Sequence, residues 1–370
     1  MRSVVLVSAL AAFAVAAPAP QQIDFAEIED APDPVFSGPG DSSVATRIAY
    51  DPVAAKKSAT AEVFADPLTK RESVEKRGAN DPCGKQPDGY GPKPPVDTAA
   101  DFLAFTVFAE TSAQAHEPQG YASSFTDLKG STHAPNYLGL TTLKTYDTIQ
   151  CARLCDDKVG CSGFNIYFER DPTLNPAEGC PNPKGFTNIK CTLWGTGVSP
   201  QTATNTGEHR GPADDSGEKF HVVITGSNGY NKNAPPPAIA GYSGPIGAGG
   251  AINAPSANGV NTFMGAKYFN QPYDTSVCAA ACAAQTAYNS RHPTNGQYKV
   301  CKFFNAYILS KNNVPEGLYC AMYTQPWDRK YGTNQGQYRG SDYYSVSSSY
   351  LYTLQETPSG PSPTSPSPTP

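Results

Sequence analysis

Carboxylate side chains are the first place to look for catalysis in this sequence. Glu169 and Asp171 directly follow an apolar stretch at 164–168. A glycoside hydrolase needs only two carboxyl groups, one as an acid and the other as a base or nucleophile. The alternative is an ion pair with Arg170 that closes the loop after a strand, with Asp171-Pro172 starting a turn. We favour the ion pair, because the second half of the chain has no equivalent pair. We therefore do not expect an enzyme.

Other catalytic and metal-binding patterns are missing from the sequence. The Gly241-Tyr-Ser243-Gly stretch lacks the last glycine of a nucleophile elbow. The glycine-rich residues 247–250 follow no predicted strand, which a phosphate-binding loop would need. None of the histidines has the spacing of a metal site: His116, His133, His209, His221 and His292. We expect no metal and no cofactor.

The 10 cysteines carry the clearest pattern. Zinc sites usually show Cys-x2-Cys, often with histidine, whereas the close pairs here are separated by three residues. Because all the cysteines can pair with one another, we expect disulfides and no free catalytic thiol. Eight of them fall into two similar sets, namely Cys151, Cys155, Cys161 and Cys191, then Cys278, Cys282, Cys301 and Cys320.

A longer stretch around these cysteines occurs twice. Residues 146–155 and 273–282 both read Tyr-Asp-Thr-x-x-Cys-x3-Cys. Further matches follow in the same order, at 161–167 with 301–307, 191–194 with 320–323, and 205–211 with 334–340. Such ordered self-similarity indicates one module present twice.

The spacing of the cysteines favours one set of bonds. Each set of four allows three pairings. Two cysteines four residues apart lie on one face of a helix, from which each can reach a different strand. The short gap before Cys161 makes its bond to Cys155 possible. The resulting pairs are Cys155–Cys161, Cys151–Cys191, Cys282–Cys301, Cys278–Cys320 and, from the two left over, Cys83–Cys180.

Local signals place these cysteines on regular elements. Asp147 and Asp274 suit the N-caps of short helices that begin each cysteine pair. The alternation at 164–168 is typical of a strand with one buried face. Spacing alone does not separate a buried helix from a strand at 97–116, and we favour a helix because of the Ala and Glu residues that follow. Strands are predicted at 121–128 and 137–143, and at 220–225 as the last strand of the first module, ended by 226–229.

Length and composition bound the class of protein. The 370 residues suggest about two domains, and the net charge of -5 gives no reason to expect a nucleic-acid partner. Residues 1–17 have a basic start and a short apolar run, as in a secretory signal peptide. No later stretch is long enough for a transmembrane helix. We expect a soluble extracellular protein with no membrane contact.

Composition also predicts the boundaries. We expect a propeptide at 18–77, released after the dibasic pair Lys76-Arg77, which resembles the Lys-Arg sites cut by fungal processing proteases. An ordinary solvated linker is the alternative. The remaining parts are a first module with an N-terminal extension (78–232), a Pro/Gly-rich linker (233–250) and a second module (251–355). The tail (356–370) is expected to be disordered, and its Pro/Ser/Thr composition is typical of segments that carry O-linked sugars.

The cysteine pattern resembles the PAN/apple domain superfamily. The matching motifs are Tyr-Asp before Cys-x3-Cys, then Cys-x2-Phe-Asn, then Cys-x-Leu, within 137–225 and 264–352. The stretches 164–172 and 226–230 are similar to a group of secreted fungal proteins. The resemblance implies an α+β fold in which a curved antiparallel sheet cradles one short helix. It also implies non-catalytic binding of proteins or carbohydrates. The insertion that carries Cys180 departs from the pattern, so no specific ligand follows.

Aromatic residues are the better clue to a ligand. The sequence has 21 tyrosines, and exposed Tyr and Trp rings anchor sugars or protein partners. The alternative is that tyrosine simply fills strand positions. We predict ligand contacts at Trp327, Tyr331, Tyr323 and Trp194. The expected function is binding of a cell-wall polysaccharide through the loops. The alternative is a protein-interaction, effector or structural wall component, and a glycoside hydrolase is a weaker third hypothesis.

Overall fold

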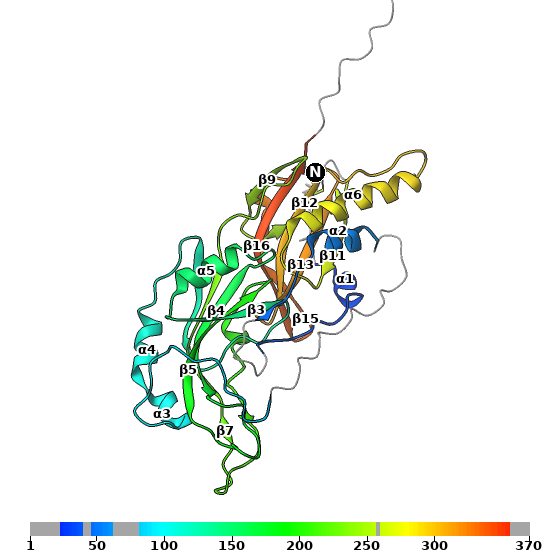
Figure 1. The fold of residues 1–370 in the computed structure, drawn as a ribbon. Helices are drawn as coiled ribbons and strands as arrows, with labels where there is room; N and C mark the ends of the chain where they lie inside the picture. The colour runs from blue at the N-terminus through cyan, green and yellow to red at the C-terminus, as the bar shows by residue number, and fades with distance from the viewer. Residues whose placement is uncertain (1–22, 40–45, 62–80, 257–259, 356–370) are drawn as a thin grey trace, which may run out of the picture.

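The computed structural model describes residues 23–39, 46–61, 81–256 and 260–355 (Figure 1). The predicted signal peptide 1–17, the dibasic pair Lys76-Arg77 and the tail 356–370 lie outside these residues. Two antiparallel sheets dominate the described part, and a few short helices cover them. The fold is therefore of the α+β class.

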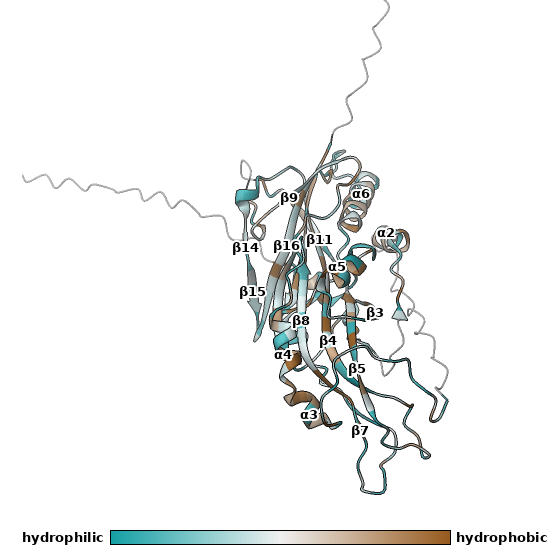
Figure 2. Ribbon diagram, turned by 60° about the vertical axis from the view of Figure 1, so that its left-hand side comes forward, coloured by the Kyte–Doolittle hydropathy of each residue, from teal (hydrophilic) through white to brown (hydrophobic). Residues whose placement is uncertain are grey.

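The first sheet is built from residues of the first half and one short N-terminal strand. Its order is β1 (Thr46–Arg47), β3 (Tyr137–Leu143), β5 (Gly185–Trp194), β4 (Gly163–Pro172), β8 (Val223–Lys232) and β2 (Tyr121–Leu128). Three helices accompany it, α3 (Ala99–Ala104), α4 (Thr106–Ala113) and α5 (Thr148–Asp156). Figure 2 shows hydrophobic stretches in α3 and α4, beside the sheet. The strands predicted at 121–128 and 137–143 are thus confirmed. The segment 97–116 is helical as predicted, but it forms two short helices separated at Phe105, whose backbone is extended.

The second sheet has the order β11 (Phe263–Phe269), β13 (Val314–Tyr323), β12 (Phe303–Lys311), β16 (Asp342–Leu354) and β15 (Gly336–Arg339), with β9 (Tyr242–Gly247) also paired to β16. The long helix α6 (Thr275–Arg291) packs against it. Two further helices are α1 (Phe25–Glu29) and α2 (Pro52–Ala61). Two small strand pairs are β6 (His209–Arg210) with β7 (Phe220–His221), and β10 (Ala251–Ile252) with β14 (Gly332–Asn334). The 3-10 turns are η1 (Pro200–Thr202) and η2 (Arg329–Tyr331).

The two sheets share their central order and register. The strands β3-β5-β4-β8 correspond to β11-β13-β12-β16. Ile166 lies opposite Cys191 in the first sheet, and Ala306 lies opposite Cys320 in the second. The structure contains the five predicted disulfides, Cys83–Cys180, Cys151–Cys191, Cys155–Cys161, Cys278–Cys320 and Cys282–Cys301. In each half, one disulfide ties the helix to a central strand. Cys151–Cys191 joins α5 to β5, and Cys278–Cys320 joins α6 to β13.

The repeated Tyr-Asp pair fixes where each of these helices begins. The Asp147 carboxylate accepts a hydrogen bond from the backbone N–H of Gln150, which caps α5. Asp274 caps α6 in the same way, through the N–H of Ser276. The preceding tyrosines donate to backbone carbonyls across the sheet, Tyr146 to Gly226 at 2.7 Å and Tyr273 to Ser348 at 2.6 Å. The repeated stretch is therefore part of the scaffold.

A buried asparagine joins the neighbouring strands in each half. The Asn165 side chain accepts from the backbone N–H of Thr132 and donates to the hydroxyl of Ser227. Asn305 makes the equivalent contacts, accepting from the N–H of Ile252 and donating to the hydroxyl of Ser349. Both amides are fully buried, so their hydrogen bonds satisfy groups that water cannot reach.

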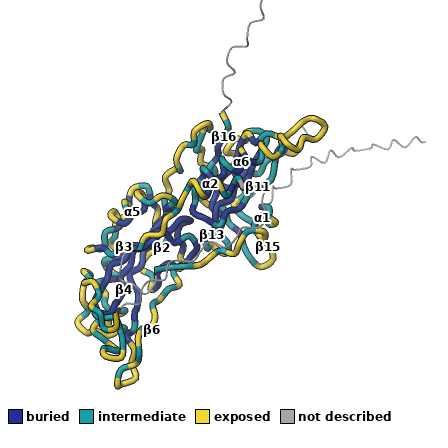
Figure 3. Tube along the Cα trace, turned by 45° about the vertical axis from the view of Figure 1, so that its right-hand side comes forward, coloured by how far each residue is buried: buried dark blue, intermediate teal, exposed yellow. Residues whose placement is uncertain are grey.

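The central strands of both sheets are buried, as the dark blue segments in Figure 3 show. The pattern at 164–168 predicted a strand with one buried face, but every residue of β4 is buried. The even-numbered residues Phe164, Ile166 and Phe168 face α5 and its disulfides. Polar side chains of the odd-numbered residues fill the other face. The prediction of an open second face is therefore wrong.

The last strand of the first half continues past its predicted end. Residues 226–229 were expected to end it, yet β8 runs on to Lys232. Gly226 has a φ of +56°, and a Cβ there would lie 3.0 Å from the carbonyl oxygen of Phe108. The register with β4 shifts between Ile166 and Phe168, beside this glycine. The glycine makes a bulge that the strand passes through.

Part of the predicted linker belongs to the second sheet. Residues 242–247 form β9, which pairs with β16. The two halves also touch directly, because the backbone N–H of Tyr273 donates to the carbonyl of Gly195 and the Asn136 amide donates to the carbonyl of Glu316. Contacts of this kind hold the two sheets beside each other.

The N-terminal segment, residues 23–39 and 46–61, folds against both sheets (Figure 1). Its strand β1 pairs with the edge strand β3 of the first sheet. Its helix α2 packs on α6, with Ala55 and Ala59 buried. Its helix α1 packs on β11, the edge strand of the second sheet. Residues that composition assigns to a propeptide are therefore an integral part of the described fold.

Candidate binding surface

Two of the four predicted ligand contacts lie in the core. Trp194 has an exposed fraction of 0%, and its indole N–H donates to Thr192. Tyr323 has an exposed fraction of 1%, and its hydroxyl donates to the carbonyl of Ile252. Neither ring offers a face to a ligand. These predictions fail because both residues end a central strand at a point where the second face of the sheet is also covered.

The other two predicted contacts lie together at the surface of the second half. Trp327 and Tyr331 are partly exposed, and their rings meet edge to face with centroids 5.2 Å apart. The indole N–H of Trp327 donates to the hydroxyl of Thr262, which fixes the orientation of the ring. The adjacent residues Asp328–Lys330 are exposed. This loop presents a fixed aromatic pair beside hydrogen-bonding groups.

The carboxylate pair that prompted the enzyme hypothesis lies on the face of the first sheet that points away from α5, and this face is also buried. Glu169 and Asp171 are both buried, and both accept from the ammonium group of Lys190 on β5. The Asn188 amide also donates to Asp171, at 2.7 Å. Buried carboxylates need such partners, because isolated charges are costly to remove from water. The ion pair predicted with Arg170 is formed elsewhere, since Arg170 pairs with Asp97.

Burial and mutual repulsion shape the titration of this cluster. Burial, and then the charge of Asp171, raise the pKa of Glu169 well above its ordinary value, against the opposing effect of Lys190. Burial alone would lower the pKa of Lys190, but its two carboxylate partners outweigh burial and raise that pKa. The Glu169 carboxyl group therefore keeps its proton to a higher pH than an exposed glutamate would.

This geometry does not match a pair of glycosidase carboxyl groups. Such groups stand about 5–9 Å apart on either side of an open substrate site. Here both carboxylates accept from one lysine, and neither lines one of the hollows of the surface described below. The cluster therefore acts as a structural core of the first sheet.

Part of the equivalent face of the second sheet is covered by residues 23–31, and we refer to this covered surface as a groove. Tyr268 and Tyr319 lie opposite each other on β11 and β13 and pack in one cluster with Ile23 and Phe25. Gln337 lies opposite Tyr344 in the β15–β16 hairpin and forms one wall with it. The hairpin strands meet closely at Gly336, whose φ is +144°, because a Cβ there would lie 2.2 Å from the carbonyl oxygen of Tyr344. The wall therefore requires glycine at that position.

Two cations border this groove, which we call the Tyr319 groove. Lys267 lies on the edge strand β11, and Arg339 lies two residues after Gln337 on β15. The groove contains residues 23–31 of the same chain, with Ile23 buried against its tyrosines. Beside Phe25, a hollow of about 560 Å³ remains along 334–340. Neither the groove nor its occupant was predicted, because residues about 300 positions apart carry no mutual signal in one sequence.

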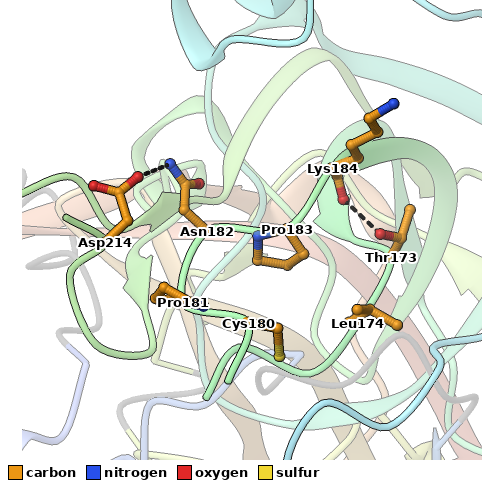
Figure 4. A pocket seen from close by; sticks show the side chains of 8 residues that line it. All are labelled: Thr173, Leu174, Cys180, Pro181, Asn182, Pro183, Lys184 and Asp214. Carbon is orange, nitrogen blue, oxygen red and sulfur yellow. Dashed lines mark hydrogen bonds between the residues drawn. The ribbon is translucent and has the colours of Figure 1, made fainter. Parts of the chain in front are cut away.

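A second hollow, of about 380 Å³, lies next to the Cys83–Cys180 disulfide (Figure 4). The Asn182 amide donates to Asp214, and the Thr173 hydroxyl donates to the carbonyl of Lys184. These polar groups bind one another across the loop. The hollow thus shows no set of side chains that converge on a ligand.

Other kinds of site find no support in the part of the chain that the structure describes. No three His, Cys, Asp or Glu side chains there are grouped to hold a metal ion. His209 and His221 stack with ring centroids 4.0 Å apart, but no third ligand completes a site within the described ranges. No helix among the described residues is both long and apolar enough to cross a membrane.

No known family model, curated protein or solved structure matches this chain.

Proposed function

We propose that the protein is a secreted, non-catalytic binding protein built from two apple-like modules. Its five disulfides are typical of proteins from oxidising compartments. The repeated helix, sheet order and cysteine bonds support the two-module description. A polysaccharide of the cell wall is the first candidate ligand.

The fixed pair of Trp327 and Tyr331 carries this proposal. The hydrogen bond from Trp327 to Thr262 and the edge contact with Tyr331 orient the indole before any ligand arrives. A rigid aromatic ring loses little conformational freedom on binding, and exposed charged neighbours can bind hydroxyl groups. Stacking of a sugar ring on Trp327 is the expected contact.

Retention on insoluble chitin, β-glucan and cellulose tests this proposal. We expect the wild-type chain to bind at least one of them. Trp327→Ala should weaken that binding roughly tenfold or more, because aromatic residues at the centre of an interface carry much of the binding energy. Tyr298→Ala is the matched control, because Tyr298 is an exposed tyrosine of the same half. Equal melting temperatures would show that both variants are folded. No retention of the wild-type chain, or full retention of Trp327→Ala, would contradict the proposal.

A protein ligand is the second candidate. The Tyr319 groove favours it, because a polypeptide segment already lies in this groove.

A further inference from the structure

The contacts of residues 23–31 in the Tyr319 groove divide into two kinds. The first kind involves only the backbone of the segment. The N–H of Ile23 donates to the Gln337 side chain at 2.9 Å, and the N–H of Asp24 donates to the Tyr319 hydroxyl at 2.7 Å. Any peptide that enters the groove could make these bonds, because each residue except proline carries the same N–H group.

The second kind of contact depends on side chains. The ring of Phe25 meets Tyr344 edge to face with centroids 4.9 Å apart, and the Arg339 guanidinium lies 4.8 Å from the centroid of the same ring. An aromatic residue between a tyrosine and an arginine gains both ring packing and a cation–π contact. The groove therefore has a specific position for an aromatic side chain.

Charge complementarity adds a second requirement. The Lys267 ammonium binds Glu27 at 2.9 Å, and Arg339 forms an ion pair with Glu29. Residues 23–31 contain Asp24, Glu27, Glu29 and Asp30 and no Lys or Arg. The groove selects an aromatic residue followed by acidic residues two and four positions later.

The segment is held less firmly than the core beneath it. Ile23 is its one buried side chain between residues 23 and 31, whereas Phe25 and Glu27 stay partly exposed and Glu29 is exposed. Helix α1 has only 5 residues, too few for a helix that is stable by itself. Contacts of this kind open more easily than a core strand does. A competing peptide can therefore replace the segment while the sheet stays folded.

We propose that the Tyr319 groove is a recognition site for acidic polypeptide segments of other proteins, of the pattern aromatic-x-acidic-x-acidic, and that residues 23–31 occupy it in cis. This proposal deepens the protein-ligand candidate above and does not depend on polysaccharide binding. The occupant in cis competes at a high effective concentration, because it is part of the same chain. Its displacement sets the affinity for an outside partner.

The test uses the full chain and a labelled synthetic peptide of residues 23–32, acetylated so that Ile23 keeps an amide N–H. The open variant carries Phe25→Ala, Glu27→Ala and Glu29→Ala, which remove the aromatic contact and both ion pairs of the segment. We expect the peptide to bind the open variant at least roughly tenfold more tightly than the wild-type chain, because the competitor in cis is weakened. Added salt should weaken this binding, because part-exposed ion pairs are screened.

A charge exchange separates recognition from mere folding. Lys267→Glu added to the open variant should strongly weaken binding of the peptide, because Lys267 pairs with Glu27, and a peptide with Glu27→Lys should restore it. Lys299→Glu is the matched control, because Lys299 is an exposed cation of the same half, and should change nothing. Circular dichroism and melting temperature check that each variant is folded. Equal affinities of the wild-type chain and the open variant would overturn the proposal. Failure of the exchanged pair to restore binding would also overturn it.

Discussion

Lys190 and Tyr319 occupy equivalent positions in the two sheets, and each directly precedes a disulfide-bonded cysteine. Each also lies opposite a tyrosine on the neighbouring strand, Lys190 opposite Tyr167 and Tyr319 opposite Tyr307. In the second sheet the two tyrosine rings stack with centroids 4.9 Å apart. In the first sheet, a lysine with two carboxylates takes the place of that stack. The same arrangement of strands thus packs either two stacked tyrosine rings or a buried ion-pair cluster at this position.

The ionic filling makes the first sheet sensitive to the loss of one partner. We expect Lys190→Met to lower the free energy of unfolding by about 3–5 kcal/mol, because it leaves two buried carboxyl groups without a cation. Chemical denaturation of the full chain measures this change. The triple variant Glu169→Leu, Asp171→Asn and Lys190→Tyr removes all three charges, with Leu and Tyr taken from the equivalent positions Leu309 and Tyr319 of the second sheet. It should recover most of the loss. A Lys190→Met protein as stable as the wild type would contradict this description of the cluster.

Stability should fall as the pH rises through the mildly acidic range. Burial raises the pKa of Glu316 from 4.5 to about 7. Between these values the folded chain holds a proton that the unfolded chain releases, so the free energy of unfolding falls as pH increases. Glu169 acts in the same direction, because its pKa is also raised.

Denaturation midpoints across that range give the measurement. Glu316→Gln should flatten the decline between about pH 4.5 and about pH 7, because glutamine cannot ionise. Glu169→Gln should flatten it further. A decline of the same slope in both variants would show that other groups cause it.

The two buried asparagines should contribute similarly to stability. Asn165→Leu leaves the N–H of Thr132 and the hydroxyl of Ser227 without that partner, and Asn305→Leu does the same at Ile252 and Ser349. Each variant should lose at least about 2 kcal/mol, since unsatisfied buried groups are costly. Thermal unfolding of the single variants measures both losses. If only one variant were destabilised, the repeated contacts would not be energetically equivalent.

Helix α2 offers a test of how the N-terminal segment is held. Ala59 has an exposed fraction of 0% against α6, so Ala59→Arg should separate the two helices. Trypsin should then cut after Lys56 and Lys57 several times faster, while the disulfide-bonded sheets stay intact. Ala54→Arg places the same side chain on the exposed side of α2 and serves as the control. Equal cleavage rates in the two variants would contradict the packing of α2 on α6. Limited digestion followed by mass spectrometry gives these rates.

Much of the scaffold could be predicted from the sequence, because it depends on local spacing and repetition. Four of the five disulfides and the caps at Asp147 and Asp274 follow from residues close together or repeated. The fifth, Cys83–Cys180, follows because these two cysteines remain after the other eight are paired. The strand at 164–168 was expected for the same reason. The burial of its second face was not expected, because an alternating pattern indicates only that one face is buried. It carries no information on whether distant segments cover the other face. Trp194 and Tyr323 were misplaced at the surface for that reason.

The pairing of distant residues is what only the tertiary structure decided. Lys190 contacts Glu169 and Asp171 because of the register between β4 and β5. This register cannot be predicted from the Glu-Arg-Asp stretch alone. Phe25 meets Arg339 because the chain returns to a groove formed by its last strands. The sequence by itself determined a duplicated, disulfide-bonded scaffold, since covalent spacing limits each helix and its cysteines. Which surfaces remain open depends on packing between distant segments, and that packing is a property of the whole fold.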